Sequence, residues 1–375
     1  MPDFFSHNLQ PRHFRNLKEH QYAAEGKSLF EPVFQKFWVW LVDFIPTNIH
    51  PNLLTLLGLI FNLAFTIPLL FLDVSLKDNI SPIALIFGII CIFLYQTLDA
   101  VDGKQARKLK ISSPLGELLD HGCDSISMVL LTIVLIGTVG FGDNLLVSLF
   151  LFLILNINFY AAHWLCFVSG KIQFGKIDVT ETLCGLMGLM LISTIFGVNV
   201  WRTSIGVQIR TLPTLLTAFL TIKYFISVLK TISAGGVGKN GTTVADSSIL
   251  SPGIPLLLTL FMTLKNASSS INNENETLFS SYPALFLLLH GLIIAKLSIN
   301  LVVGHMAKAK VKLFDPMMLG ALGVMINSFI GNPLNATMVF LMGLIFCVTY
   351  ITGSFIRLCQ DLAKYLELKS IIFIK

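Results

Sequence analysis

Residues 99–124 read DAVDGKQARKLKISSPLGELLDHGCD and lie between two strongly apolar runs. On a helix, Asp99 and Asp102 are three residues apart and Asp120 and Asp124 four apart, so each pair projects from one helical face. Two such faces opposed across a short hairpin make an oxygen-rich pocket, which suits hard divalent cations such as Mg²⁺ or Mn²⁺. A carboxylate near hydrocarbon is costly unless it is paired or metal-bound. The stretch therefore predicts a functional site at a membrane boundary rather than a solvated loop.

Composition places this site in a membrane protein. The chain has 375 residues, of which 54% are hydrophobic and 13% charged, and its mean hydropathy is +0.77. These values are too apolar for a soluble globular protein. The six cysteines are scattered singly without a C-x-x-C pair, so neither a disulfide framework nor a zinc site is indicated. The net charge of +5 is spread over short loops, which argues against a nucleic-acid partner.

The predicted fold is all-α: a polytopic membrane protein with about ten transmembrane helices and an interfacial amphipathic helix within residues 29–45. The ten apolar runs are residues 51–72, 81–100, 116–138, 145–168, 181–199, 212–229, 248–264, 282–303, 314–331 and 336–356. This pattern divides the chain into an N-terminal segment (1–46), helices that carry the site (47–230), remaining transmembrane helices (231–357) and a tail (358–375).

The distribution of basic residues predicts the orientation. Ten spans put both termini on one side of the membrane, and most lysines and arginines fall in segments on that same side. The positive-inside rule therefore predicts that the N-terminus, the C-terminus and the aspartate hairpin are cytosolic. On this topology Asn266 and Asn275, which begin N-x-S/T triplets, are luminal glycosylation candidates. Lys296 and Asn300 lie at membrane depth, where they either meet a lipid phosphate or pair with another helix.

The spacing of the hairpin carries a further signal. It fits D-x2-D-G-x2-A-R-x8-G-x3-D-x3-D, filled by Asp99, Asp102, Gly103, Ala106, Arg107, Gly116, Asp120 and Asp124. This pattern resembles the signature of the CDP-alcohol phosphotransferases, which are integral membrane enzymes. The resemblance implies that the four aspartates hold two metal ions, that Gly103, Ala106 and Gly116 allow close approach of the cytidine nucleotide, and that Arg107 binds phosphate. Asn52, in a Pro-Asn pair, is implied to contact the CDP group, although it also suits a helix cap.

His121 shares a helical face with Glu117 and Asp124. Its imidazole is a candidate general base for the attacking hydroxyl, as the resemblance implies, or a hydrogen-bonding support for a metal-bound carboxylate. Asp124 is the rival base. Glu117 either orients His121 or contacts the cytidine amino group, and a solvated glutamate in a first helical turn is the structural alternative.

The sequence resembles one branch of the family in particular, the choline and ethanolamine phosphotransferases. The similarity lies in Asp-His-Gly-x-Asp, in Ala-His-Trp at 162–164, in Ile-Asp-Val-Thr-Glu at 177–181 and in the glycine run at 235–241. Trp164 or Tyr160 is a candidate for holding a quaternary ammonium by cation–π contact, with Glu181 as counter-charge. An interfacial aromatic anchor is the structural alternative.

The resemblance implies transfer of phosphocholine or phosphoethanolamine from CDP-choline or CDP-ethanolamine to diacylglycerol, giving a phospholipid and CMP, the last step of the Kennedy pathway. It further implies a membrane of the endoplasmic reticulum or the Golgi, and it is compatible with a homodimer. One alternative is a CDP-diacylglycerol-dependent phosphatidyltransferase of the same family, although such enzymes usually have fewer spans. The other is a cation transporter, although inverted repeats, which mark many transporters, are not detected.

Overall fold

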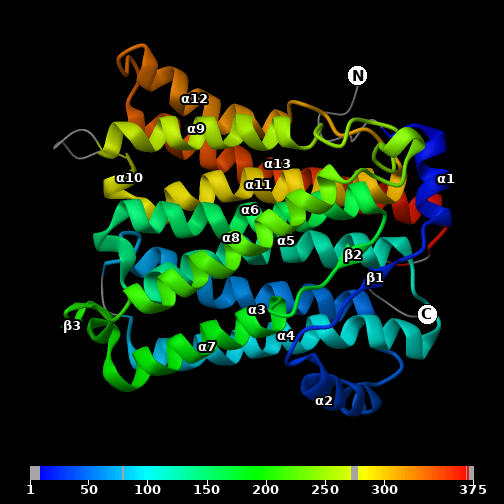
Figure 1. The fold of residues 1–375 in the computed structure, drawn as a ribbon, viewed down its shortest axis with the longest axis horizontal. Coiled ribbons are helices and arrows are strands. Elements are labelled where there is room, and N and C mark those ends of the chain that lie inside the picture. The colour runs from blue at the N-terminus through cyan, green and yellow to red at the C-terminus, as the bar shows by residue number, and fades with distance from the viewer. Residues whose placement is uncertain (1–8, 78–79, 272–277, 369, 371–375) are drawn as a thin grey trace.

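The computed structural model describes residues 9–77, 80–271, 278–368 and 370, and the prediction of an all-α membrane protein is confirmed. Among these residues, eight helices are long and apolar enough to span a membrane: α3 (Pro51–Leu72), α4 (Pro82–Leu109), α5 (Pro114–Thr138), α6 (Leu145–Ser169), α7 (Val179–Phe196), α8 (Thr211–Ser233), α11 (Pro283–Ala307) and α13 (Ala336–Tyr365). They run roughly side by side along the long axis of the molecule (Figure 1).

Shorter elements complete the described part of the chain. The remaining helices are α1 (Pro11–Glu19), α2 (Glu31–Phe44), α9 (Gly253–Ile271), α10 (Leu278–Ser281) and α12 (Leu319–Phe329), with 3₁₀ turns η1 (Phe141–Asp143), η2 (Val198–Arg202), η3 (Lys239–Gly241) and η4 (Pro316–Met318). Strands β1 (Ala24–Glu25) and β2 (Ile172–Gln173) pair in parallel, and β3 (Ser204–Ile205) and β4 (Val207–Gln208) pair antiparallel. The seventh and ninth expected spans correspond to α9 and to η4 with α12.

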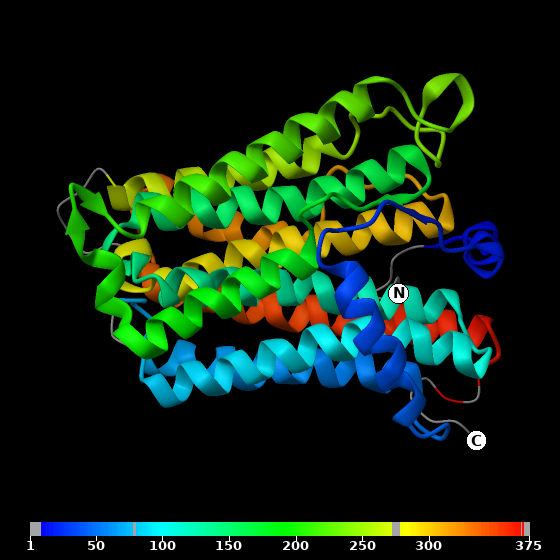
Figure 2. The same cartoon turned by 60° about the horizontal axis from the view of Figure 1, so that its bottom comes forward.

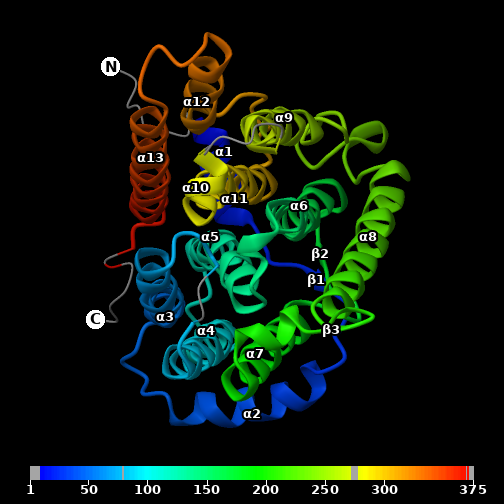
Figure 3. The same ribbon diagram turned by 90° about the vertical axis from the view of Figure 1, so that its left-hand side faces the viewer.

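Helix α11 forms the centre of the bundle. Of its most apolar window, 89% is buried inside the protein, a larger share than in the other seven long helices. It packs against α5 and α6, and the view along the bundle shows these three helices surrounded by the others (Figure 3). A helix that is mostly apolar and has no distinct polar face, such as α11, is expected to be buried on all sides.

Helix α2 lies across the direction of the bundle (Figure 3), as expected for an interfacial helix. Val33, Trp40 and Phe44 are 71%, 56% and 65% exposed, which gives α2 an uncovered apolar face. Two lysines of α4 fix the other face. The ammonium group of Lys104 lies 5.3 Å from the centre of the Trp38 ring, and that of Lys108 donates a 2.7 Å hydrogen bond to the Val42 carbonyl near the end of α2.

The structure accounts for two polar groups that the sequence leaves open. Lys296 pairs with another segment of the chain: its ammonium lies 3.6 Å from Oδ2 of Asp315, and Asn300 donates a 2.7 Å hydrogen bond to the same oxygen. Asn266 is only 6% exposed and donates to the Ala321 carbonyl, so it is not an accessible glycosylation site in this fold. Asn275 lies outside the described residues.

Candidate active site

The hairpin between α4 and α5 sets the position of every predicted metal ligand. Helix α4 continues to Leu109, beyond the apolar run that ends near residue 100, and Lys110 closes it in the left-handed conformation with φ 58°. Helix α5 begins at once, because Pro114 occupies its first turn and the Ser113 hydroxyl accepts a 3.2 Å hydrogen bond from the Gly116 amide. We call this end of the bundle the hairpin end.

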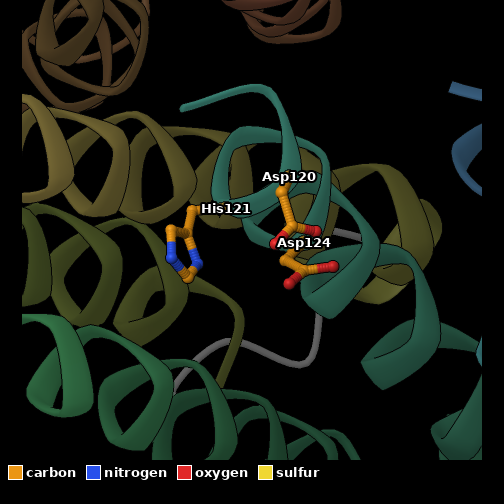
Figure 4. A group of neighbouring side chains, drawn as sticks. All are labelled: Asp120, His121 and Asp124. Carbon is orange, nitrogen blue, oxygen red and sulfur yellow. The ribbon is translucent and has the colours of Figure 1, made fainter. Parts of the chain in front are cut away.

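The aspartates predicted to bind metal lie near one another. The carboxyl group of Asp99 neighbours those of Asp120 and Asp124. Asp120, His121 and Asp124 each present a ligand atom, and these atoms lie within 4.8 Å of one another. Figure 4 shows the two aspartate side chains together, with the His121 ring to one side. Oδ1 of Asp120 is buried and has no hydrogen-bond partner in the described part of the chain, as expected of an oxygen that is meant to hold a cation.

Two neighbouring hydroxyl groups orient the carboxylates. Thr55 of α3 donates a hydrogen bond to Oδ2 of Asp102, and Tyr95 of α4 donates a 2.7 Å hydrogen bond to Oδ1 of Asp124. Such partners fix the direction in which a ligand oxygen points. Neither residue is predicted from the sequence. The available signal was weak: a threonine and a tyrosine in apolar helices, each one turn from a predicted site residue.

The predicted nucleotide-binding residues lie beside the aspartates. Asn52, at the start of α3, is buried, and a Cβ atom added to Gly116 would lie 3.3 Å from its Oδ1 atom. A Cβ atom on Gly103 would lie 3.4 Å from the Arg107 guanidinium. Arg107 itself is exposed, so its guanidinium remains accessible to a phosphate. Ala106 is partly buried on the same helix.

An N-terminal segment, residues 20–30, crosses the hairpin end, and we call it the strap (Figure 2). Nε2 of His20 lies 3.0 Å from both carboxylate oxygens of Glu117. The Tyr22 ring lies over the His121 ring, with centroids 6.4 Å apart and planes inclined by 27°. The strap therefore covers two predicted site residues. The sequence does not predict this contact, because the segment is far from the hairpin along the chain.

Backbone contacts hold the strap in place. Strand β1 within it pairs with β2, and the Leu29 amide donates a 3.0 Å hydrogen bond to the Lys176 carbonyl. The Phe30 amide donates a 2.5 Å hydrogen bond to Glu181, whose other carboxylate oxygen accepts one from the Asp178 amide. Glu181 thus caps α7 and anchors the strap.

The two aromatic head-group candidates contact the segment that precedes α9. The Tyr160 hydroxyl donates a 2.7 Å hydrogen bond to the Pro252 carbonyl, and the Trp164 indole donates one of 2.7 Å to the Ile249 carbonyl. His163, between them in the sequence, faces elsewhere on α6. Its ring lies edge-on to that of His121, with centroids 5.5 Å apart. Neighbouring helical residues differ in direction by about 100°, and the sequence alone could not say which one faces the site.

A small cavity lies beside His121, between α5, α6 and α11. The side chains that line it and bear on its chemistry are Glu117, His121, His163, Cys166, Leu301 and His305. Three imidazole nitrogens of this cavity are buried without a hydrogen-bond partner among the described residues: Nε2 of His121, Nε2 of His163 and Nδ1 of His305.

Gly122, in the middle of Asp-His-Gly-x-Asp, is a packing residue. A Cβ atom at this position would lie 2.2 Å from the Cζ atom of Phe355 on α13. The ring of Phe355 therefore occupies the space that any other residue would need.

Comparisons with known proteins identify the family of this chain. The sequence model of the family described as CDP-alcohol phosphatidyltransferase matches residues 48–264. Cholinephosphotransferase 1 of Danio rerio is 37% identical over 369 residues, covering 95% of this chain and 93% of that protein. The proteins of the same name from Rattus norvegicus and Homo sapiens are 35% and 34% identical, covering 96% and 97% of this chain and 90% and 89% of theirs. The strap and α11 lie outside residues 48–264, which the family model matches, although the similarity to these three relatives extends over almost the whole chain.

Proposed function

This chain belongs to the CDP-alcohol phosphatidyltransferase family, and from that membership we propose that it transfers phosphocholine from CDP-choline to diacylglycerol, releasing CMP and forming phosphatidylcholine. Three relatives that are similar over almost the whole chain are named cholinephosphotransferase 1, which supports choline as the head group. CDP-ethanolamine is the second candidate donor, because the motifs resemble a branch that includes both activities. The same relatives argue against a CDP-diacylglycerol-dependent reaction. Membership of this enzyme family argues against a cation transporter.

The observation that carries the proposal is the aspartate cluster with His121 at its edge. Asp99, Asp102, Asp120 and Asp124 would hold Mg²⁺ or Mn²⁺, and the unpaired Oδ1 atom of Asp120 fits such a role. Bound there, the cations would neutralise the charge that develops on the diphosphate of the donor.

The chain's own residues supply the remaining chemistry. Arg107 offers a planar fork for a phosphate of the donor. Asn52, Gly103, Ala106 and Gly116 leave room beside it for the cytidine nucleotide. Glu117, which is in contact with His20, either orients the His121 ring or contacts the cytidine amino group. These roles are part of the proposal.

His121 is the proposed general base. Nε2 of this residue is unpaired among the described residues, so its neutral ring can accept a proton from the hydroxyl of diacylglycerol. The hydroxyl oxygen then forms a bond to the phosphorus that bears choline. The bond from that phosphorus to the CMP oxygen breaks, and CMP leaves with the electron pair. Asp124 is the rival base, but it already accepts a hydrogen bond from Tyr95.

The test is a CMP-release assay on purified protein, with CDP-choline and CDP-ethanolamine measured side by side against diacylglycerol. We expect activity that requires Mg²⁺ or Mn²⁺. Asp99→Asn, Asp102→Asn, Asp120→Asn and Asp124→Asn should each lower the rate by at least about 10²-fold while membrane insertion persists, because each removes a charged ligand but keeps its shape. A variant with wild-type activity at low Mg²⁺ would exclude that aspartate from the site.

We also propose the orientation given by the positive-inside rule, with the hairpin end in the cytosol of endoplasmic reticulum or Golgi membranes. Ile111 and Ile205 lie at opposite ends of the bundle and are 37% and 77% exposed. In microsomes, an impermeant thiol reagent should label Ile111→Cys without permeabilisation, and it should label Ile205→Cys only after the lumen is opened. The reverse pattern would contradict the proposed topology.

A further inference from the structure

The cavity beside His121 has a chemical character of its own. His121 stands between two groups of side chains, the aspartates on one side and the cavity on the other. His163 comes from α6, and Leu301, Val302 and His305 come from α11. Glu117 and His121 line the cavity and already have proposed roles, whereas His163 and His305, which line it too, have none yet.

The hydrogen bonding of His163 fixes what its free nitrogen can do. Nδ1 lies 3.0 Å from the Phe159 carbonyl oxygen, which can only accept a hydrogen bond, so Nδ1 carries the hydrogen. The neutral ring then presents a lone pair at Nε2. This atom is buried and has no partner among the residues that the structure describes. An unpaired buried acceptor is costly, and the group that satisfies it must be a donor such as a hydroxyl.

His305 complements His163. Its Nδ1 atom is also buried without a partner among the described residues, and its ring contacts His20 edge-on at a centroid distance of 5.2 Å. Because none of the described hydrogen bonds holds Nδ1 as an acceptor, this atom is free to carry a hydrogen and donate it. The cavity thus presents a fixed acceptor and an available donor, next to the apolar side chains of Leu301 and Val302.

The position of the cavity suits a membrane lipid. His121 follows the start of α5 by about 10 Å, and His163 precedes the end of α6 by about 9 Å, at 1.5 Å per residue. The cavity therefore lies near the boundary between hydrocarbon and polar head groups. The glycerol backbone of a lipid lies at the same level, with apolar chains on one side and oxygen atoms on the other.

We infer that this cavity, whose volume is about 10 Å³, receives the polar end of the glycerol backbone of the acceptor lipid, where His163 accepts a hydrogen bond from the free hydroxyl and His305 donates one to an ester carbonyl. The inference rests on the proposed function, since it assumes a diacylglycerol acceptor. His163 holds the hydroxyl beside His121. Rotation about the C–O bond then turns the same proton towards His121, which removes it as described above.

The first experiment measures acceptor binding without turnover. Radiolabelled 1,2-dioctanoylglycerol is bound to purified protein in detergent micelles with EDTA present, so that no transfer occurs. His163→Met removes the hydrogen-bonding atom but keeps the length of the side chain, and we expect a dissociation constant about threefold to tenfold higher. His163→Gln keeps a hydrogen-bonding atom near the position of Nε2 and should lose less.

His290→Met is the matched control. This histidine is also fully buried, on α11, but both of its ring nitrogens are engaged, by the Phe286 carbonyl at 2.9 Å and by Asn266 at 3.3 Å. The substitution should lower thermal stability and leave the affinity for dioctanoylglycerol unchanged. Equal affinity losses at positions 163 and 290 would overturn the inference, because they would indicate general loosening of the bundle.

The second experiment isolates His305. The wild-type protein should bind 1,2-dioctanoylglycerol about threefold to tenfold more tightly than 1,2-dioctylglycerol, an ether lipid without ester carbonyls. His305→Leu should abolish this preference, His305→Asn should retain part of it, and His163→Met should leave it intact. A preference that survives in His305→Leu would overturn the assignment of His305.

The outcomes separate this inference from the proposed function. A wild-type protein that releases no CMP from CDP-choline or CDP-ethanolamine with diacylglycerol would refute the proposed function. An active wild-type protein whose KM for diacylglycerol is unchanged in both His163→Met and His305→Leu would refute the subsite alone. We expect these variants to raise the KM for diacylglycerol and to leave the KM for the CDP-alcohol within about twofold.

Discussion

Replacing Gly122 with alanine should damage the site through packing alone. The added Cβ atom would lie 2.2 Å from Cζ and 2.4 Å from Cε2 of Phe355, whereas carbon atoms in contact prefer about 3.5–4.0 Å. The ring or α5 must therefore move by more than about 1 Å. Overpacking of this kind typically costs about 1–3 kcal/mol, which exceeds the roughly 1 kcal/mol that alanine gains over glycine in a helix.

The displacement acts directly beside His121. A shift of about 1 Å in a reacting group can cost on the order of 10²-fold in rate, so we expect Gly122→Ala to lower CMP release by tenfold to a hundredfold. The melting temperature should fall as well. Gly188→Ala is the matched control, because no other heavy atom lies within 4 Å of the Cβ position at this glycine of α7. It should keep full activity and be equally or more stable.

A double variant tests the cause. Phe355→Leu removes the ring atoms that clash with Cβ, so Gly122→Ala combined with Phe355→Leu should be more stable and more active than Gly122→Ala alone. The coupling between two residues in contact is expected to be about 0.5–3 kcal/mol. If the double variant shows simple addition of the two single losses, then the contact with Phe355 is not the reason for the glycine.

Two further changes test the strap and the opposite end of the bundle. Partial burial, together with the nearby Asp120 and Glu117, raises the pKa of the Tyr22 phenol, so the phenol is neutral at every pH below about 10, the usual pKa of tyrosine. Tyr22→Phe should therefore keep both the rate and its pH profile up to pH 9, whereas Tyr22→Ala should lower the rate by uncovering His121. Equal rates in both variants would exclude a covering role. Asp143 accepts hydrogen bonds of 2.7 and 3.1 Å from the buried Arg210. Asp143→Ala should lower the stability by about 1–3 kcal/mol, less than the loss of a fully buried ion pair, because Asp143 is 37% exposed. An unchanged melting temperature would contradict this prediction.

The aspartate cluster was predictable because it depends on local spacing. Asp99 and Asp102, and Asp120 and Asp124, keep their relative directions in any helix, and a short turn with Ser113 brings the two pairs together. The ends of the helices are harder to predict from the sequence. Hydropathy falls near residue 100, but α4 continues to Leu109 because leaving the hydrocarbon does not by itself end a helix.

Residues that depend on tertiary packing could not be predicted. His20 reaches Glu117 across 97 positions of the sequence, and His305 reaches the cavity from a helix that the family signature does not include. The Ala-His-Trp motif predicts a functional residue at Trp164, whereas in the structure His163 lines the cavity. Asn266 shows the converse case: its triplet indicates glycosylation, and packing buries it.

The central place of α11 has a consequence for the biosynthesis of the protein. The ribosome completes the aspartate hairpin at residue 124, but the residues of α11 that close the cavity, Leu301, Val302 and His305, emerge long afterwards. Helices of membrane proteins insert first and associate later. The faces of α5 and α6 that α11 covers in the folded protein therefore stay exposed to lipid until α11 has inserted. A transcript truncated before residue 283 would therefore encode an intact signature without a finished enzyme.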